Sequence, residues 1–379
     1  MSLSAPISPN RRLVIAQVIR SFAGGGAQRV PYDLTRTFGK FGHRSIGIAL
    51  GHLGDELDSD TSDAEFYEAG ATRSPATLAG ALHRLRKLFV ETSVDVVHVH
   101  GTGILPVVFA AASLCRPRPR LCFTWHDSGE VLERSGIRRS TLRFCIRRCD
   151  WVSGSSRSVV ERLMQNSGIH SANVFHGGVP ARAVPPAQPA STTQIAWIAR
   201  LSANKDPQTL LRAISELRQQ GFAPRATLAG SPFAHAVAYG YDTTALSKQL
   251  RLDDCVEFVG QLTRPEVERL LSESTIGVQT SHSEGLSLAL MEQMMAGLAI
   301  VATDVGDTSE AIIHEETGLL TPPGDVDALA EALRRLVLDP ALRSRLGAAA
   351  RARAMEHFSI EAMTRRALRE YERVLAERA

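Results

Sequence analysis

Short apolar runs alternate with longer stretches of helical spacing along most of the chain. Each run is followed by a helical pattern, and the first such pattern covers residues 27–41. The strand-like runs occupy residues 13–19, 95–100, 121–126, 194–199, 226–229, 256–259, 275–279 and 299–303. Runs of this length between helical segments predict βα units and parallel sheets.

Residues 180–193 interrupt this alternation. They are rich in Pro, Ala and Thr and show no hydrophobic periodicity, which is typical of a linker. We therefore predict an α/β protein with two doubly wound, Rossmann-like domains that face each other across a cleft. The expected division is an N-terminal domain over residues 1–180, a linker over 181–193, a C-terminal domain over 194–358, and a charged helix over 359–379 that could cross back to the first domain.

The composition is that of a soluble globular protein. The chain has 379 residues, more than one core usually holds, with 44% hydrophobic and 22% charged residues. No apolar run reaches the ~18 residues needed to cross a bilayer, and the first residues lack the apolar segment of a signal peptide. The five cysteines show no zinc or disulfide spacing, so a cytoplasmic protein is expected.

Charge is unevenly distributed along the chain. Residues 1–190 contain 23 Lys and Arg against 15 Asp and Glu, whereas the remainder contains 20 against 25. The first part is therefore basic and the second acidic. A basic first half favours anionic ligands or an anionic surface.

Three glycines, Gly24, Gly25 and Gly26, separate the first strand from the first helical pattern. Glycines let the backbone approach an anion, and the following helix N-terminus offers free N–H groups. The spacing departs from G-x-G-x-x-G because Arg29 occupies the last position, and no P-loop lysine follows. The loop is either a tight βα turn or a ligand contact, and its place at a strand's carboxyl end favours contact.

A second candidate site follows the strand at residues 194–199. Arg200 ends this strand, and Lys205 lies in the loop before the next helix. Two cations at the carboxyl end of a strand can neutralise a diphosphate. The alternative is a solvated surface pair of little consequence.

The largely apolar sequence SEGLSLALMEQMMAG contains two glutamates. Glu284 precedes a helix expected to begin near Leu286, which would leave the amides of Leu286 and Ser287 free for an anion. Glu284 would then reach a polyol beside that anion, and Glu292, about two turns further, could accept from a ribose diol. The alternative is that Glu284 caps the helix and Glu292 forms a structural ion pair.

Taken together, these features resemble the retaining GT-B glycosyltransferases of the large family 4 group. The resemblance is strongest over residues 195–340 and is weaker in the first domain. It rests on Arg200 with Lys205, the two glutamates around GLSLALM, ATDVG at 302–306, GLL at 318–320, GGGAQRV, DVVHVH and FTWHD.

The resemblance implies a role for each candidate residue. Arg200 and Lys205 would hold the donor diphosphate, Glu284 the hydroxyls of the donor sugar, and Glu292 the ribose. The remaining implied contacts are the amides of Gly285, Leu286 and Ser287 near the phosphate and sugar, His126 at the reaction centre, and the loop of Gly25 and Gly26 beneath the diphosphate.

The sequence departs from the family pattern at three places. His176 stands in HGGV where Asn-Gly-Val is common, Asp206 stands where Gly usually follows the lysine, and Asp307 replaces a second Gly after Gly306. These departures leave the reaction class unchanged and put the identity of the donor sugar in doubt.

Several histidines and acids could suggest other chemistry. His126 at a strand's end could stabilise an oxocarbenium ion or orient a sugar hydroxyl, or it could pair with Asp127 and cap a helix. His98 and His100 share a strand face without a third ligand at metal spacing. The D-x-D at residues 58–60 lies in a polar loop. We expect no metal and no cofactor apart from a nucleotide-diphosphate sugar as co-substrate.

An arginine-rich segment covers residues 134–148. Arg139, Arg143 and Arg147 would share a helix face, which is either solvated or docks on an anionic membrane or a lipid-diphosphate acceptor. Nucleic acid is not expected, because aromatic residues are not interleaved with the basic ones. The arginines of the segment are Arg134, Arg138, Arg139, Arg143, Arg147 and Arg148.

The resulting prediction is a metal-independent, retaining hexosyltransferase. It would move a sugar from a nucleotide-diphosphate sugar to a hydroxyl of a carbohydrate or lipid-linked acceptor in cell-surface polysaccharide or glycolipid synthesis. It would act in the cytoplasm, either free or at the inner face of the membrane. The alternatives are a non-catalytic nucleotide-sugar-binding protein and another GT-B enzyme such as a nucleotide-sugar epimerase.

Overall fold

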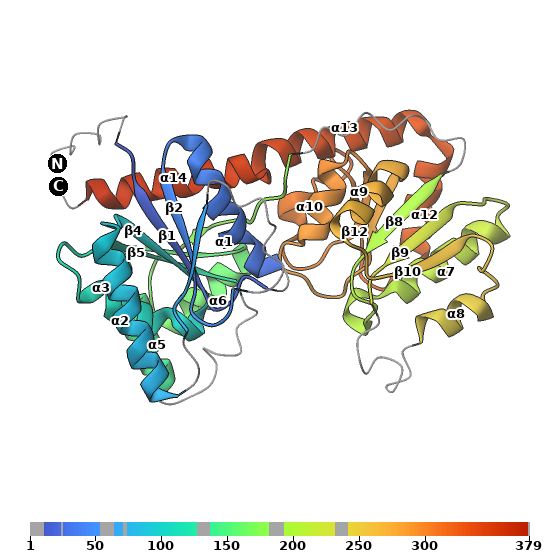
Figure 1. Ribbon diagram of the computed structural model, residues 1–379. Helices are drawn as coiled ribbons and strands as arrows, with labels where there is room; N and C mark the ends of the chain where they lie inside the picture. Colours follow the sequence, from blue (N-terminus) through green and yellow to red (C-terminus); the bar gives the residue numbers. More distant parts are fainter. Residues whose placement is uncertain are drawn as a thin grey trace. The chain divides into compact units, whose positions relative to one another are not determined.

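The computed structural model describes residues 11–23, 26–53, 64–70, 74–126, 137–181, 193–231 and 242–377. The chain forms two compact units: residues 1–178 together with 360–379, and residues 179–359. Each unit contains a parallel β-sheet with helices on both faces (Figure 1). The predicted α/β class with two doubly wound sheets is confirmed, and the C-terminal helix belongs to the first unit.

In the described part of the first unit, the sheet has seven strands in the order β3-β2-β1-β4-β5-β6-β7. Neighbouring strands are parallel throughout. Their bounds are β1 (Val14–Ile19), β2 (Arg44–Ala49), β3 (Glu65–Glu68), β4 (Val96–His100), β5 (Arg120–Trp125), β6 (Trp151–Gly154) and β7 (Asn173–Val174).

Helices from distant parts of the chain cover the two faces of this sheet (Figure 1). One face packs against α1 (Gly26–Thr37) and α14 (Ile360–Ala376). The other packs against α2 (Pro75–Glu91), α3 (Leu105–Ser113), α5 (Ile137–Ile146) and α6 (Arg157–Ser167). Because successive strand residues point to opposite faces, Ile15 packs toward α14 while Ala16 and Val18 pack toward α2 and α3.

In the described part of the second unit, the sheet has six parallel strands in the order β10-β9-β8-β11-β12-β13. Their bounds are β8 (Gln194–Ile198), β9 (Arg225–Ala229), β10 (Val256–Gly260), β11 (Ile276–Gln279), β12 (Ala299–Thr303) and β13 (Leu319–Thr321). These strands lie within two residues of the runs predicted from the hydrophobic pattern, except β13, which was not predicted.

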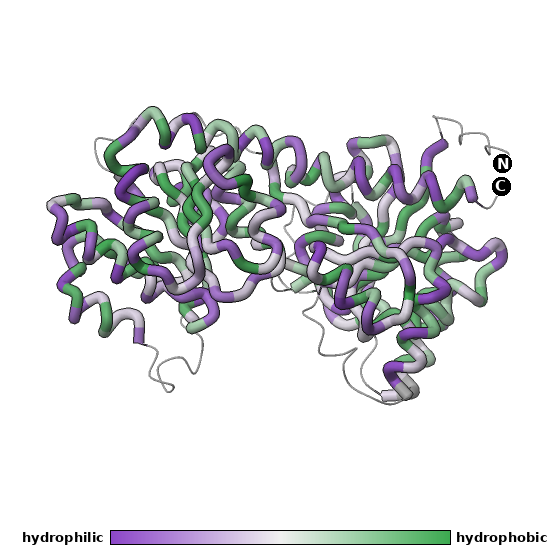
Figure 2. The backbone as a smooth tube through the Cα atoms, turned by 180° about the vertical axis from the view of Figure 1, so that it is seen from behind, coloured by the Kyte–Doolittle hydropathy of each residue, from purple (hydrophilic) through white to green (hydrophobic). Residues whose placement is uncertain are grey.

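The helices of the second unit also divide between two faces. On one side lie α7 (Pro207–Gln219), α8 (Thr243–Gln249) and α12 (Val326–Leu338). On the other lie α9 (Arg264–Glu273), α10 (Leu288–Met295), α11 (Thr308–Ala311) and α13 (Pro340–His357). Along many of these helices hydrophilic and hydrophobic positions alternate (Figure 2), as expected where one helix face lies on a sheet.

The strand order of each sheet reverses at one point. In the first unit the chain proceeds outward from β1 to β3 and then returns to place β4 on the other side of β1. In the second unit the same reversal lies between β8 and β11. The loops that follow two such strands diverge and leave a crevice, which is where ligands bind in open α/β sheets.

Two predicted helices differ in detail from the structure. The first ends at Thr37 and continues to Phe41 as a 3₁₀ turn. The helix expected near Leu286 begins at Leu288, because the hydroxyl of Ser287 accepts a hydrogen bond from the Leu290 amide and caps the helix. Over the described ranges, every helix is too short or too polar to cross a membrane.

Candidate functional site

Lys205 and Glu284 form an ion pair where the sheet of the second unit reverses. Lys205 ends a 3₁₀ turn after β8 (Ala203–Lys205), and Glu284 lies in the loop after β11. Their side chains are only 20% and 11% exposed. The two loops that meet at the switch point therefore contribute one cation and one anion to a partly buried spot.

Hydroxyl groups fix the geometry of this pair. Ser281 donates a hydrogen bond to Oε1 of Glu284 over 2.6 Å, and its own carbonyl accepts from Thr303 over 2.6 Å. Thr280 donates to the Lys205 carbonyl over 2.9 Å and accepts from the buried indole of Trp197 over 3.0 Å. The side chain of Glu284 and the backbone of Lys205 are thus anchored to the core of the second unit through short polar residues.

The two loops are also joined through their backbones. The His282 amide donates to the Asn204 carbonyl over 2.8 Å, and the Asn204 side chain donates to the Ser283 carbonyl over 3.0 Å. His282 further contacts Asp206, with 3.2 Å between Nε2 and a carboxylate oxygen. The loops after β8 and β11 therefore form one structural element.

Asp206 explains one departure from the family pattern. Its φ is +44°, in the left-handed region that glycine adopts most easily. Its carboxylate accepts from the Thr209 amide over 3.3 Å and from the Thr209 hydroxyl over 2.5 Å, capping α7. Asp206 therefore keeps the turn that a glycine would make and adds a helix cap.

Gly306 lies directly against the backbone of Glu284. Its φ is +54°, and a Cβ at this position would stand 1.8 Å from the Glu284 carbonyl oxygen. No side chain fits there without displacing the loop. This glycine, in the sequence ATDVG, thus allows β12 and the Glu284 loop to approach each other.

The other residues of the second unit that we expected to bind the sugar donor lie in the same two loops or next to them. Arg200 is exposed and follows the end of β8. Gly285, Leu286 and Ser287 precede α10 rather than forming its first turn. The expectation that the Leu286 and Ser287 amides belong to the helix is therefore wrong, since the capping hydroxyl of Ser287 shifts the start to Leu288.

Glu292 has an ionic partner that the sequence did not suggest. Its Oε1 lies 3.6 Å from a guanidinium nitrogen of Arg264, at the start of α9. The Glu292 side chain is 20% exposed, so the carboxylate remains accessible. Both alternatives predicted for Glu292, a structural ion pair and a contact with ribose, are compatible with this position.

In the first unit, His126 directly follows β5 and contacts a second histidine. Its Nε2 lies 2.9 Å from Nδ1 of His100, and the two rings are stacked with centroids 5.2 Å apart. Burial lowers the pKa of His126 to about 4, so the imidazole is neutral near pH 7. In the glycine loop, Gly26 is the first residue of α1, and Gly25 lies outside the described residues. Asp127 and the D-x-D at residues 58–60 also lie outside them.

His98 and His100 use all four of their ring nitrogens in hydrogen bonds to other side chains. The partners are Tyr371 and Thr124 for His98, and His126 and Gln17 for His100. Within the described ranges, no group of three or more His, Cys, Asp or Glu residues is arranged to hold a metal. Burial lowers the pKa of both histidines well below the usual value.

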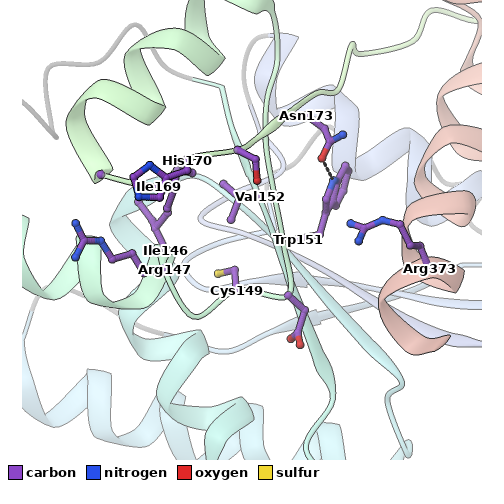
Figure 3. A pocket seen from close by; sticks show the side chains of 12 residues that line it. Ile146, Arg147, Cys149, Trp151, Val152, Ile169, His170, Asn173 and Arg373 are labelled. Atoms are coloured by element: carbon purple, nitrogen blue, oxygen red, sulfur yellow. Dashed lines mark hydrogen bonds between the residues drawn. The ribbon is translucent and has the colours of Figure 1, made fainter. Parts of the chain in front are cut away.

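A cavity of about 670 Å³ in the first unit lies away from these residues. It is lined by the segments that precede β6 and β7 and by Arg373 of α14, so it opens at the amino ends of the strands (Figure 3). Trp151 forms one wall and donates to Asn173 over 3.1 Å. Since ligands of open α/β sheets bind at the carboxyl ends, this cavity is not the candidate site.

The arginine-rich segment differs from the predicted face of Arg139, Arg143 and Arg147. Arg143 donates to the Asn166 carbonyl over 2.6 Å and Arg147 to the Ser167 carbonyl over 3.2 Å, so both support the end of α6. These two arginines therefore have structural partners. The part of the segment before residue 137 lies outside the described residues.

The exposed side of α5 carries a hydrophobic side chain instead. Phe144 is 49% exposed, and the guanidinium of Arg148 lies over its ring, 3.7 Å from the centroid. Phe109 of α3 contacts the same ring edge-on at 5.9 Å. Arg148 is itself exposed, which makes this surface both apolar and basic.

Comparisons with known proteins agree with this architecture. The model of the family "Glycosyl transferases group 1" matches residues 182–353, and that of "Glycosyltransferase Family 4" matches residues 24–182. The crystal structure of Anabaena Alr3699/HepE in complex with UDP superimposes with a TM-score of 0.77 at 18% identity, covering 94% of this chain and 99% of that one. The fold is therefore the GT-B fold, and the chain belongs to the group 1 glycosyltransferases.

Two curated relatives show how far the sequence similarity extends. A D-inositol 3-phosphate glycosyltransferase of Kribbella flavida is 30% identical over 160 residues, which is 41% of this chain and 38% of the relative. The lipopolysaccharide core biosynthesis mannosyltransferase LpcC of Rhizobium leguminosarum is 26% identical and covers 83% of this chain and 85% of the relative. Similarity to the first is thus confined to well under half of each protein.

Proposed function

We propose that this protein is a retaining glycosyltransferase that moves a hexose from a nucleotide-diphosphate sugar to an acceptor hydroxyl. The observation that carries the proposal is the partly buried Lys205–Glu284 pair at the switch point of the second unit. A cation at this place can bind a diphosphate, and a carboxylate can accept hydrogen bonds from sugar hydroxyls. The pair could therefore bind both the diphosphate and the sugar of a nucleotide sugar. The UDP complex of Alr3699/HepE, a protein of the same fold, supports a nucleotide at this kind of site.

The leaving diphosphate would be stabilised by side-chain cations. Lys205, paired with Glu284, and Arg200 both follow β8, so they would lie at the loop where we place the diphosphate. The backbone amides of Gly285 and Leu286 would add hydrogen bonds. Positive side chains in these positions supply the charge that a divalent ion supplies elsewhere, and we propose that the reaction proceeds without metal and without a resident cofactor.

Glu284 and Glu292 would recognise different ends of the donor. Glu284 accepts from Ser281 on one side, which leaves its remaining lone pairs for the hydroxyls of the transferred sugar. Glu292 would accept from the ribose diol in competition with its 3.6 Å contact to Arg264. Glu284 lies in the loop before α10 and Glu292 in the second turn of that helix, so the diphosphate would span the interval between them.

The chemistry would require no side-chain base. The acceptor hydroxyl would attack from the face that the nucleotide leaves, and a phosphate oxygen would take its proton. His126, neutral and at the end of β5, would contact a sugar hydroxyl. Glu284 and Lys205 would then act by orienting the substrate and by neutralising charge.

The decisive experiment combines donor binding with turnover. A thermal-shift panel of UDP-, GDP- and ADP-sugars should reveal one donor that raises the melting temperature, since a ligand that binds the native state stabilises it. With that donor and a panel of acceptors, nucleotide release should follow, with the donor's anomeric configuration kept in the product and full activity in EDTA. A protein that binds a donor and never cleaves it would be a non-catalytic nucleotide-sugar sensor.

The acceptor would be part of a cell-surface polysaccharide or glycolipid, as the likeness to the lipopolysaccharide mannosyltransferase LpcC suggests. We further propose a cytoplasmic protein whose α5 surface docks on anionic lipid. Phe144 is exposed there beneath the guanidinium of Arg148, a combination that would insert one ring while the cation contacts a headgroup. Vesicle binding tests this part separately from catalysis.

A further inference from the structure

A chain of buried polar side chains crosses the sheet of the first unit. Its members come from β1, β4, β5, β6 and α14, and all except His126 are at least 95% buried. Buried polar groups need hydrogen-bond partners, so the pattern of donors and acceptors in such a chain is constrained. The members are Gln17, His98, His100, Thr124, His126, Ser153 and Tyr371.

One end of the chain is fixed by a group that can only accept. The Ser153 hydroxyl donates to the Phe123 carbonyl over 3.4 Å. Ser153 has one proton, so Thr124, at 2.7 Å, must donate to Ser153. Thr124 has then used its own proton, and Nε2 of His98, at 2.7 Å, must donate to Thr124.

The same reasoning continues through the C-terminal helix. Since a neutral imidazole carries one N–H, Nδ1 of His98 accepts, and its partner at 2.6 Å is the Tyr371 hydroxyl. Tyr371 has then used its proton, so the amide nitrogen of Gln17 donates to the Tyr371 oxygen over 3.2 Å. This orients the Gln17 carbonyl oxygen toward Nε2 of His100, at 2.7 Å.

The final step reaches His126. Nε2 of His100 donates to Gln17, so Nδ1 of His100 accepts, and the Nε2–H of His126 is its donor at 2.9 Å. Burial lowers the pKa of all three histidines, which makes the neutral ring the relevant form near pH 7. His126 is then left with a lone pair on Nδ1.

We propose that Gln17, His100 and Tyr371 are positioning residues that hold His126 as the Nε2–H tautomer, so that its side chain meets the ligand only as a hydrogen-bond acceptor. Such a group favours a sugar hydroxyl and disfavours a carboxylate or phosphate oxygen at the same place. The ligand preference rests on the proposed function, whereas the tautomer does not. Tyr371 contributes from the last helix of the chain, 245 residues beyond His126 in sequence.

Aromatic packing protects this arrangement. The ring of His98 packs against the rings of Trp151 and Phe175, with centroids at 5.3 Å and 5.9 Å, and Tyr371 packs edge-on to Trp151 at 6.2 Å. Figure 3 shows Trp151 at the neighbouring cavity wall. The low-polarity surroundings strengthen each hydrogen bond and make an unpaired member costly, which favours one proton arrangement over a mixture.

The test is a long-range ¹H–¹⁵N correlation spectrum of the full-length protein labelled in its histidines. His126→Gln identifies the His126 signals by their loss. The expected result is a protonated Nε2 and an unprotonated Nδ1 in His126. A protonated Nδ1 would overturn the proposal, because it requires every donor in the chain to be reversed. The outcome is independent of whether any sugar is transferred.

A variant series tests the role of the helix. Tyr371→Phe should yield signals of both His126 tautomers and lower kcat/KM for the donor by roughly tenfold, the size expected for one neutral hydrogen bond. Thr364→Val removes another buried hydroxyl from α14, which donates only to Ile360 within the helix, and should leave both readouts unchanged. Gln17→Met replaces Tyr371→Phe if the latter does not fold. A single unchanged tautomer in a folded Tyr371→Phe or Gln17→Met protein contradicts the proposal.

Discussion

Lys205 and Glu284 lie 79 positions apart in sequence and form an ion pair at the switch point of the second sheet. Each is the natural partner of one half of a nucleotide sugar. A diphosphate that binds Lys205 would compete with Glu284, and sugar hydroxyls would in turn compensate Glu284. The pair therefore keeps two partly buried charges compensated, and under the proposed function it would exchange its partners when a donor binds.

Replacement of Lys205 by Ala should abolish most donor turnover. Removal of a group that stabilises a developing negative charge typically lowers kcat by about 10²–10³-fold. The rate of nucleotide release measures the effect, and Lys248→Ala, an exposed lysine of α8, is the matched control. A Lys205→Ala protein with the wild-type rate would remove Lys205 from the site.

Gly306→Ala should damage the site without touching a ligand. The added Cβ would meet the Glu284 carbonyl at 1.8 Å, and φ of +54° is unfavourable for alanine. We expect a loss of stability of about 1–3 kcal/mol together with lost activity, measured by urea unfolding and nucleotide release. Gly39→Ala has nothing within 4 Å of its Cβ and should be nearly neutral; equal effects of both changes would refute the steric argument.

Glu292 and Arg264 can be separated by paired variants. If Glu292 binds ribose, Glu292→Gln should weaken nucleotide binding by roughly tenfold or more, the cost of losing a hydrogen bond to a charged acceptor. Arg264→Met removes the ion pair and leaves the carboxylate, so nucleotide affinity should be kept. Isothermal titration with the preferred nucleotide distinguishes the two. Equal loss in both variants would mean that Glu292 only supports α9.

The α5 surface should bind anionic vesicles through Phe144 and its arginines. Phe144→Ser combined with Arg148→Glu removes the inserted ring and reverses one charge, so co-sedimentation with vesicles containing anionic lipid should fall at least tenfold. Arg143 and Arg147 are unsuitable for this test because they donate to carbonyls at the end of α6. Absence of binding by the wild-type protein, or equal binding by the variant, would exclude the docking surface.

Stability should decrease as the pH falls below about 6.5, the usual histidine value. The pKa values of His98, His100 and His126 are lowered by burial, that of His126 to about 4, so the unfolded chain binds more protons in this range. The contribution of these histidines to the free energy of unfolding is therefore fully present above their pKa in the unfolded chain. It is lost as the pH falls toward their pKa in the folded protein, by up to about 1.4 kcal/mol per pH unit for each histidine. Urea unfolding at pH 7.5 and pH 5.5 measures this slope.

A variant assigns the slope to its source. His126→Gln removes one titrating group and should flatten the pH dependence by about one proton. His357→Gln changes a half-exposed histidine at the end of α13 and is the control. An unchanged slope in the His126 variant would contradict the pKa of about 4.

The sequence predicted those parts of the molecule that depend on local pattern. Buried β1 and β12 appear as largely apolar runs, interrupted in β1 only by Gln17, since parallel strands are covered on both faces. Arg200, Lys205 and Glu284 follow strands, and strand ends are where parallel sheets gather polar loops. Ser287 is also a capping signal in the sequence, and this signal predicts the observed start of α10 at Leu288.

Long-range partners could not be predicted in this way. The ion pair of Glu292 with Arg264 depends on how α9 packs beside α10. The hydrogen bond between Gln17 and Tyr371 joins residues 354 positions apart, and nothing in either local sequence indicates the other. Arg143 and Arg147 followed helical spacing, but tertiary contacts with the end of α6 decided their surroundings.

The position of Tyr371 has a consequence for how the protein is made. The first unit lacks α14 until residues 179–359 have been synthesised, because the residues of that helix follow the second unit in sequence. Until then, α1 alone covers its part of that sheet face, and Gln17 and His98 lack a shared partner. Folding that proceeds from the N-terminus during translation can thus complete the second unit before the first.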